Sequence, residues 1–282
     1  MPVSHPVQPT SDRQVLRLSR RRLLDPSRAV ELWRARELVI HLASRDLKLR
    51  YKQTALGIVW AVLPPLLAMV LFSAVFGNVM GRESGEVPYP LLCLAALVPW
   101  QVFSVSLVQA SLSLSSNQQL VTKVWFPRLV LPLASSLSPL ADALISGSIL
   151  VLAILWTGRS LPATILLLPL LSLLPVFAAL SVALWLSALN AHFRDVRNLL
   201  PFLVQGWMFA TPVVYPMSIL GERVRGLVAL NPMTPVVELF RWAALGTPAP
   251  TQFLPSFAVL FLLFAGGLLF FLRMERTLAD VV

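Results

Sequence analysis

Few side chains in this sequence are of a type and spacing that could do chemistry. The three histidines, His5, His41 and His192, do not follow a metal-ligand spacing such as HExxH. The only cysteine, Cys93, excludes an internal disulfide and a zinc site built from cysteines. The sequence has no G-x-S-x-G motif and no pair of carboxylates within an apolar segment. We therefore expect no catalytic residue, no metal and no cofactor in this chain.

ATP cannot be bound by the usual phosphate-binding loop. That loop needs a Gly-Lys dipeptide, and this dipeptide occurs nowhere in the sequence. Any ATP and Mg²⁺ that the protein uses must therefore be bound by another chain.

One acidic residue, Asp142, lies inside a long apolar segment. An ionisable group in a membrane span is by default a functional hypothesis. The alternative that we favour is a carboxylate that accepts hydrogen bonds from Ser138 or Ser146, or that faces a wet cavity. A proton-coupled carrier usually needs more such groups, so a lone Asp142 argues against one.

The composition indicates a membrane protein. Of 282 residues, 57% are hydrophobic and 13% are charged, about half the charged share of a soluble domain, which is about 25%. The net charge is +10, and the basic residues cluster before the first apolar segment. This placement favours anionic lipid and membrane orientation over nucleic acid.

Six apolar runs are long enough to cross the membrane, which takes about 20 residues. The sequence therefore predicts an all-α integral membrane domain over residues 53–282. Basic residues are concentrated before the first run, after the second and fourth, and in the tail, so both termini are expected in the cytoplasm. The predicted spans are 57–79, 91–114, 129–156, 161–189, 199–219 and 252–272.

Three further segments have a distinct character. Residues 1–28 are rich in Pro, Ser and Arg, and we expect a tail without stable structure; no cleaved leader is visible. Residues 29–52 alternate apolar and charged residues, which predicts an amphipathic helix in the cytoplasmic interface or, alternatively, a helix packed on the bundle. Between spans five and six we expect short outer helices, re-entrant or on the surface, with Glu238 and Arg241 paired at i, i+3.

Aromatic side chains are spread through the spans, and two cytoplasmic loops mix aromatic and charged residues. Any single aromatic is more often a lipid or core contact than a sugar contact, although a ring face suits a sugar. The loops 116–128 and 190–198 suggest protein docking or, equally, membrane anchoring. The channel candidates are Phe72, Phe76, Trp100, Phe103, Trp207, Phe209 and Tyr215, and the docking candidates are Phe193, Arg194, Asp195 and Arg197.

Four ordered segments resemble the ABC-2 type permeases that export lipid-linked polysaccharide. They are RDLKLRYKQTALGIVWAVLPPLL (45–67), NQQLVTKVWFPR (117–128), LNAHFRDVRNLLPFL (189–203) and NPMTPVVELFRWAALG (231–246). The resemblance covers about 30–275 and is greatest to O-antigen permeases, followed by teichoic-acid and capsule permeases.

This resemblance implies a homodimer in the cell inner membrane that carries two separate ATPase subunits. It implies that 29–52 flanks the lateral access route of an undecaprenyl-type lipid-linked polysaccharide, that 190–198 and the N-terminal region face the ATPase, and that 220–246, with Glu238 and Arg241, forms outer gate helices. The candidates for binding the pyrophosphate head group are Arg45, Lys48, Arg50 and Lys52.

Two other functions are weighed against this one. A drug or small-lipid exporter of the same superfamily usually has a larger outer domain between the first two spans, whereas the loop here, 80–90, is short. A membrane-embedded sugar transferase predicts paired acidic residues at a membrane face, and the sequence lacks them.

Overall fold

The computed structural model describes residues 26–52, 59–80, 87–193, 195–250 and 253–275. Every regular element in these ranges is a helix, and none of these residues lies in a strand. The predicted tail, 1–28, lies outside the described residues apart from 26–28, which begin the first helix.

Two helices precede the first apolar span, where the sequence predicts one. They are α1 (Pro26–Arg34) and α2 (Arg36–Tyr51), and they meet at Ala35. Val39 and Leu42 of α2 are buried and pack with residues of α6, whereas Ile40 and Leu49 are exposed. The helix therefore packs on the bundle along one side, and its place in the membrane interface stays a prediction.

Among the residues that the structure describes, five helical segments are long and apolar enough to cross a membrane. They match five of the six predicted spans, with ends shifted by a few residues. They are α3 (Val59–Met80), α4 (Tyr89–Ser116), α6 with α7 (Val130–Trp156), the run from η1 to α9 (Ala163–His192) and α13 (Leu254–Met274).

Two of these spans are interrupted helices. Ser138 and Pro139 separate the two helices of the third span, and Ser172 ends a short helix in the fourth. The pieces are α6 (Val130–Leu137), α7 (Leu140–Trp156), η1 (Ala163–Leu167), α8 (Leu168–Leu171) and α9 (Leu173–His192), and the short α5 (Gln118–Lys123) follows α4.

The sixth predicted span, 199–219, is not a continuous helix. The helix α10 (Val196–Ala210) has 15 residues and ends where Thr211 takes an extended conformation. The residue before a proline avoids the helical region, and Pro212 follows Thr211. A turn and the short η2 (Met217–Ile219) come next. Among the described residues, six membrane-length helices are therefore not confirmed.

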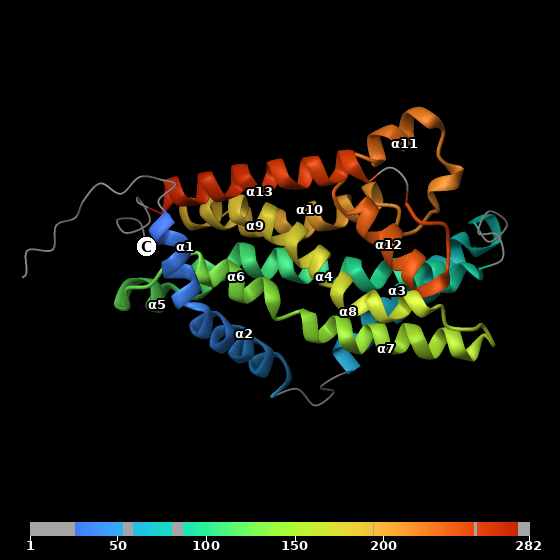
Figure 1. The fold of residues 1–282 in the computed structure, drawn as a ribbon, viewed down its shortest axis with the longest axis horizontal. Coiled ribbons are helices and arrows are strands. Elements are labelled where there is room, and N and C mark those ends of the chain that lie inside the picture. Colours follow the sequence, from blue (N-terminus) through green and yellow to red (C-terminus); the bar gives the residue numbers. More distant parts are fainter. Residues whose placement is uncertain (1–25, 53–58, 81–86, 194, 251–252, 276–282) are drawn as a thin grey trace, which may run out of the picture.

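The helix α4 is the centre of the bundle. It is buried over 78% of its apolar window, against 11% for α3, and it packs against α3, α6, α7, α9 and α12. Figure 1 shows α4 surrounded by these helices, with α13 lying along α9. The central helix therefore holds the other spans together, while α3 presents most of its surface to lipid or to another chain.

Two short helices follow α10, and the second is part of the core. They are α11 (Glu222–Val228) and α12 (Thr234–Leu245). In α12, Val236, Val237 and Phe240 are at most 1% exposed. Its apolar face is covered by α4, so this helix packs on the bundle. Whether α12 re-enters the membrane stays a prediction.

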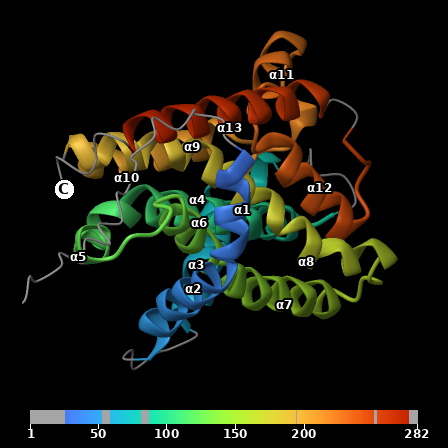
Figure 2. The same ribbon diagram turned by 60° about the vertical axis from the view of Figure 1, so that its left-hand side comes forward.

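The ends of the helices gather at two ends of the bundle. In Figure 1, α5 and the C-terminal end of α13 lie at one end, while α11 and α12 lie at the other. Figure 2 shows the same separation after a turn of 60°. The loops predicted to be cytoplasmic and those predicted to be outer therefore lie at opposite ends.

Candidate functional site

The basic residues predicted to bind a head group divide into two kinds. Arg45 donates to Asp46 Oδ1 at 2.8 and 3.1 Å and to Asn117 Oδ1 at 2.8 Å. The other carboxylate oxygen of Asp46 accepts a hydrogen bond from Ser135 at 3.1 Å. Arg45 is thus neutralised within the protein and ties α2 to the ends of α4 and α6.

Arg50 is also paired, and its partner is Asp142. The Arg50 Nη1 donates to one carboxylate oxygen of Asp142, and the Tyr51 hydroxyl donates to the other. Asp142 is 6% exposed. A buried carboxylate is stable only with a compensating charge and hydrogen bonds, and here both come from the last turn of α2.

The prediction that Ser138 or Ser146 donates a hydrogen bond to Asp142 is wrong. The Ser138 hydroxyl donates to Gln109 at 2.9 Å, and the Ser146 hydroxyl donates to the Ala61 carbonyl at 3.4 Å. A cation compensates a buried charge better than a hydroxyl does. The sequence could not reveal this pair, because Arg50 and Asp142 are 92 residues apart.

Tyr51 remains a hydrogen-bond donor throughout the physiological range. Burial, and after it the hydrogen bond to Asp142, raise the pKa of Tyr51 to about 12. Because the folded pKa lies above the ordinary value of 10, the neutral phenol stabilises the fold below pH 10. That contribution is lost between pH 10 and about pH 12.

Lys48 and Lys52 are exposed, in contrast to the two paired arginines. Neither forms an ion pair with another described residue. Arg50 keeps one nitrogen, Nη2, that is buried without a hydrogen-bond partner among the described residues. The end of α2 therefore carries two exposed ammonium groups on one face and, elsewhere on the same turn, a guanidinium with an unused donor; each is a group that can bind an anion.

Three of the channel candidates form one aromatic cluster inside the protein. The ring of Phe103 lies 5.2 Å from those of Trp100 and Trp207, measured between centroids. Phe103 is 0% exposed and Trp100 is 4% exposed. The Trp207 Nε1 donates to Asn231 at 3.0 Å. These contacts are core packing, and Phe103 reaches no surface in this arrangement.

The other channel candidates keep accessible surface. Phe72 and Phe76 are half-buried on α3, with ring centroids 6.4 Å apart. Phe209 is 52% exposed, and the Tyr215 hydroxyl donates to its carbonyl at 3.2 Å. Their contact with a sugar stays a prediction.

The outer-gate candidates Glu238 and Arg241 form the predicted ion pair, 2.9 Å apart. Arg241 is 3% exposed. It also donates to the carbonyls of Leu92 at 3.3 Å and Val213 at 3.0 Å. Arg241 therefore joins α12 to α4 and to the turn after α10. Sequence spacing predicts only the local pair.

The ATPase-docking candidates lie at the end of the bundle where α9 stops. Phe193 is 62% exposed, and Asp195 and Arg197 are exposed as well; Arg194 lies outside the described residues. In the loop after α5, Trp125 is 83% exposed. These side chains are therefore accessible, and their role in docking an ATPase stays a prediction.

A contact that sequence reasoning missed lies at the same end. Glu275, just after α13, pairs with Arg28 of α1 at 3.3 Å. Its side chain also accepts from the Arg128 backbone N–H at 3.2 Å, and Arg128 donates to the Glu275 carbonyl at 3.1 Å. The N-terminal helix, the loop before α6 and the end of α13 therefore meet at one carboxylate.

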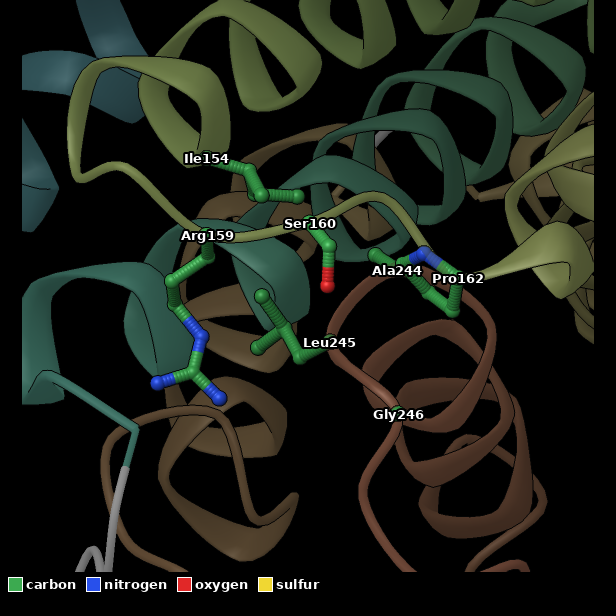
Figure 3. Close-up of a pocket in the computed structure, with 7 residues that line it drawn as sticks. All are labelled: Ile154, Arg159, Ser160, Pro162, Ala244, Leu245 and Gly246. Atoms are coloured by element: carbon green, nitrogen blue, oxygen red, sulfur yellow. The ribbon is translucent and has the colours of Figure 1, made fainter.

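A pocket of about 290 Å³ lies at the other end of α7. Figure 3 shows Arg159 and Ser160 on one side and Leu245 and Gly246, at the end of α12, on the other. None of the predicted site residues lines it. Among the described residues, no group of three or more His, Cys, Asp or Glu side chains is arranged to hold a metal.

Comparison with known proteins assigns the chain to a family. Residues 37–245 match the family model described as ABC-2 type transporter. The chain is 33% identical over 213 residues to the O-antigen export system permease protein RfbA of Myxococcus xanthus, covering 75% of this chain and 81% of that protein.

Two further relatives are more distant. The protein of the same name from Klebsiella pneumoniae is 27% identical over 73% of this chain and 79% of its own length. The polysialic acid transport protein KpsM of Escherichia coli is 26% identical over 71% of this chain and 78% of its own length. The matched region includes nearly all of α2, the spans up to α12, the half-buried Arg50 and the buried Asp142 and Arg241, and the chain belongs to the ABC-2 type transporter family.

Proposed function

We propose that this chain is the membrane subunit of an ABC exporter that moves a lipid-linked polysaccharide of the O-antigen type out of the cytoplasm. The observation that carries the proposal is the similarity, over about three quarters of the chain, to permeases named for O-antigen export. The absence of a Gly-Lys dipeptide from the sequence supports ATP binding by a separate ATPase chain. Similarity to the polysialic acid transport protein makes a capsule-type polysaccharide the second candidate substrate.

The chain crosses the inner membrane six times in this proposal, with both termini in the cytoplasm. The end of α9 and the end of α13 lie at the same end of the bundle, whereas α13 begins at the opposite end (Figure 1). The chain between them must therefore traverse the bundle, and α10 with the turn after it is the segment that does so. A 15-residue helix covers about 22 Å, and residues 211–219 supply the remaining length.

Two copies of the chain form the conduit, and each copy binds one ATPase subunit that holds ATP and Mg²⁺. The weakly buried α3 supports pairing with lipid or a second copy, because a spanning helix this exposed has apolar surface left to cover. The exposed Trp125, Phe193 and Arg197 support docking of the ATPase at the cytoplasmic end. No role for nucleic acid is proposed.

The polysaccharide travels between the two subunits after its lipid carrier arrives beside α2 and α3. The exposed Lys48 and Lys52, together with Arg50, attract the diphosphate of the carrier. Phe72, Phe76, Phe209 and Tyr215 keep the surface that sugar contact requires, whereas Trp100 and Phe103 support the wall behind them. Weak contact with many sugars favours movement over tight binding.

The test is ATP hydrolysis by the purified permease reconstituted with its ATPase. Lipid-linked polysaccharide should stimulate hydrolysis, and the same polysaccharide without its lipid should not. The double variant Lys48→Gln, Arg50→Gln should weaken stimulation, while Arg273→Gln, at an exposed arginine in the last turn of α13, should leave it unchanged. If no polysaccharide stimulates ATP hydrolysis by the parent protein, the exporter function is wrong. If the polysaccharide stimulates the double variant as strongly as the parent, the head-group role of Lys48 and Arg50 is wrong.

A further inference from the structure

The guanidinium of Arg50 is only half used by the protein. Its Nη1 donates to Asp142, whereas its Nη2 is buried and has no hydrogen-bond partner among the described residues. Arginine presents two parallel donors that match a carboxylate or a phosphate in a two-point contact. The side chain as a whole is 22% exposed, whereas Nη2 itself is covered, so an anion reaches this donor only when the guanidinium turns away from Asp142. Arg50 is therefore held in place with one donor still to be satisfied.

The Asp142 carboxylate, by contrast, has both oxygens engaged. One accepts from Arg50 and the other from the Tyr51 hydroxyl. The Asp142 side chain is 8% exposed. If the Arg50 contact were broken, the hydroxyl of Tyr51 would remain as a donor to the carboxylate. The carboxylate can thus give up its cation without losing every partner.

The pair lies where the proposed carrier lipid arrives. Arg50 is in the last turn of α2, between the exposed Lys48 and Lys52. The Ser146 hydroxyl, one turn along α7 from Asp142, contacts the Ala61 carbonyl near the start of α3. Asp142 is about 18 Å along the third span from Val130, at 1.5 Å per residue. Lys48 and Lys52, four residues apart, share one face of α2 and can hold an anion at the end of the helix that carries Arg50.

We propose that Asp142 competes with the diphosphate of the carrier lipid for Arg50 and is displaced from it when the substrate binds. This inference rests on the proposed function and adds a residue that sets the affinity for the head group. The diphosphate carries more negative charge than the carboxylate and can use both donors of the guanidinium. The displaced carboxylate then repels the bound anion, which favours its later release.

The competition lowers the apparent affinity of the site. When a binding-competent state is only partly populated, the measured dissociation constant rises by the inverse of that fraction. If Arg50 is free of Asp142 about a tenth of the time, affinity is reduced about tenfold. An exporter must release its substrate, and competition from Asp142 favours that release.

The first experiment measures binding of farnesyl diphosphate to the purified permease in nanodiscs of neutral lipid. Asp142→Asn removes the competing charge and should lower the dissociation constant about five- to tenfold. Arg50→Gln should raise it. The double variant should match Arg50→Gln alone, because Asp142 acts only through Arg50. Farnesol and inorganic pyrophosphate, tested in parallel, separate the contributions of lipid and free anion.

Two more variants guard against a purely structural effect. Glu275→Gln removes another carboxylate that joins distant segments, and it should leave the dissociation constant unchanged. Tyr51→Phe removes the donor that would stay with the displaced carboxylate and keeps the charge of Asp142, so it should raise the dissociation constant about two- to threefold. The dissociation constant of Tyr51→Phe also tests the proposal if Asp142→Asn fails to fold.

The outcomes separate this inference from the proposed function. Binding of farnesyl diphosphate by the parent protein, with unchanged or weaker binding by Asp142→Asn or with unchanged or tighter binding by Tyr51→Phe, overturns the competition. Failure of the parent to bind any prenyl diphosphate, together with no stimulation of ATP hydrolysis by lipid-linked polysaccharide, overturns the proposed function itself. Tighter binding that persists in the double variant shows that Asp142 does not act through Arg50.

Discussion

Buried charges in this protein are satisfied by partners far away in the sequence. Arg241 reaches back to the Leu92 carbonyl, 149 residues earlier, and Asp142 pairs with Arg50. In an apolar surrounding, a charge without partners is costly, so such contacts hold specific helices together. At the scale of single residues, Arg241 is a structural junction, whereas Arg50 and Asp142 are at the proposed binding site.

Replacing Arg241 by glutamine should destabilise the protein strongly. The change leaves Glu238 and the carbonyls of Leu92 and Val213 without their donor, and removing one partner of a buried pair costs about 3–5 kcal/mol. Thermal unfolding in detergent, followed by tryptophan fluorescence, should show a lower midpoint. Arg223→Gln, at an exposed position, should leave the midpoint unchanged. Equal unfolding midpoints for both variants would contradict the stabilising role of Arg241.

Adding a methyl group at Gly267 should also lower stability. A Cβ there would lie 2.8 Å from the Ser181 carbonyl oxygen and 2.8 Å from the Trp185 ring. Overpacking of this kind costs about 1–3 kcal/mol. The matched change is Gly147→Ala, where no atom lies within 4 Å. We expect the unfolding midpoint to fall only for Gly267→Ala; a fall of the same size in both would mean that α9 and α13 can move apart.

The helix α1 contacts the bundle through an ion pair at the end of α13 and through Leu32, which packs on the buried cluster around Phe271. Arg28 pairs with Glu275, and the Arg128 backbone contacts the same carboxylate, while α1 makes few contacts with any helix besides α2. At the scale of elements, this carboxylate couples the N-terminal region to the loop before α6. That loop also carries the exposed Trp125.

Glu275→Gln should loosen α1 without unfolding the protein. The pair is partly exposed, at 25% and 21% of the side chains, so its contribution is at most about 1 kcal/mol. Amide hydrogen exchange should become faster over Pro26–Arg34 and stay the same over α4. Glu222→Gln, at an exposed carboxylate in α11, serves as the comparison. Unchanged exchange in α1 would show that other contacts hold it.

The course of the whole chain depends on α10. Five segments in the described part of the chain are long enough to span a membrane, yet the C-terminal ends of α9 and α13 lie at the same end of the bundle (Figure 1). Both observations are explained if α10 and the turn after it together cross the membrane once more. The extended Thr211 before Pro212 is the physical reason why this crossing is not one helix.

Cysteine labelling should place the two ends of this crossing on opposite sides of the membrane. In a Cys93→Ala background, Asn198→Cys should react with an impermeant maleimide only after the inner membrane is opened. Ser218→Cys should react while that membrane is intact. Both positions are exposed, and Cys93 itself is buried. Reaction of both from one side would exclude a sixth crossing.

The sequence by itself determined the features that depend on neighbouring residues. Long apolar runs predict five of the observed spans, and a spacing of three residues on a helix predicts the Glu238–Arg241 pair. The missing Gly-Lys dipeptide and the four ordered segments pointed to an ABC-2 type permease before any fold was known.

Only the tertiary structure decided which distant groups meet. In the folded protein, Phe103 is buried against Trp207, and α12 packs against α4. Asp142 pairs with Arg50 and not with the expected serines. Hydropathy and helical period report which face of a segment avoids water, but they carry no information about which helix covers that face. That choice depends on how all the spans pack together, so the pairing of Arg50 with Asp142 could only be seen in the folded protein.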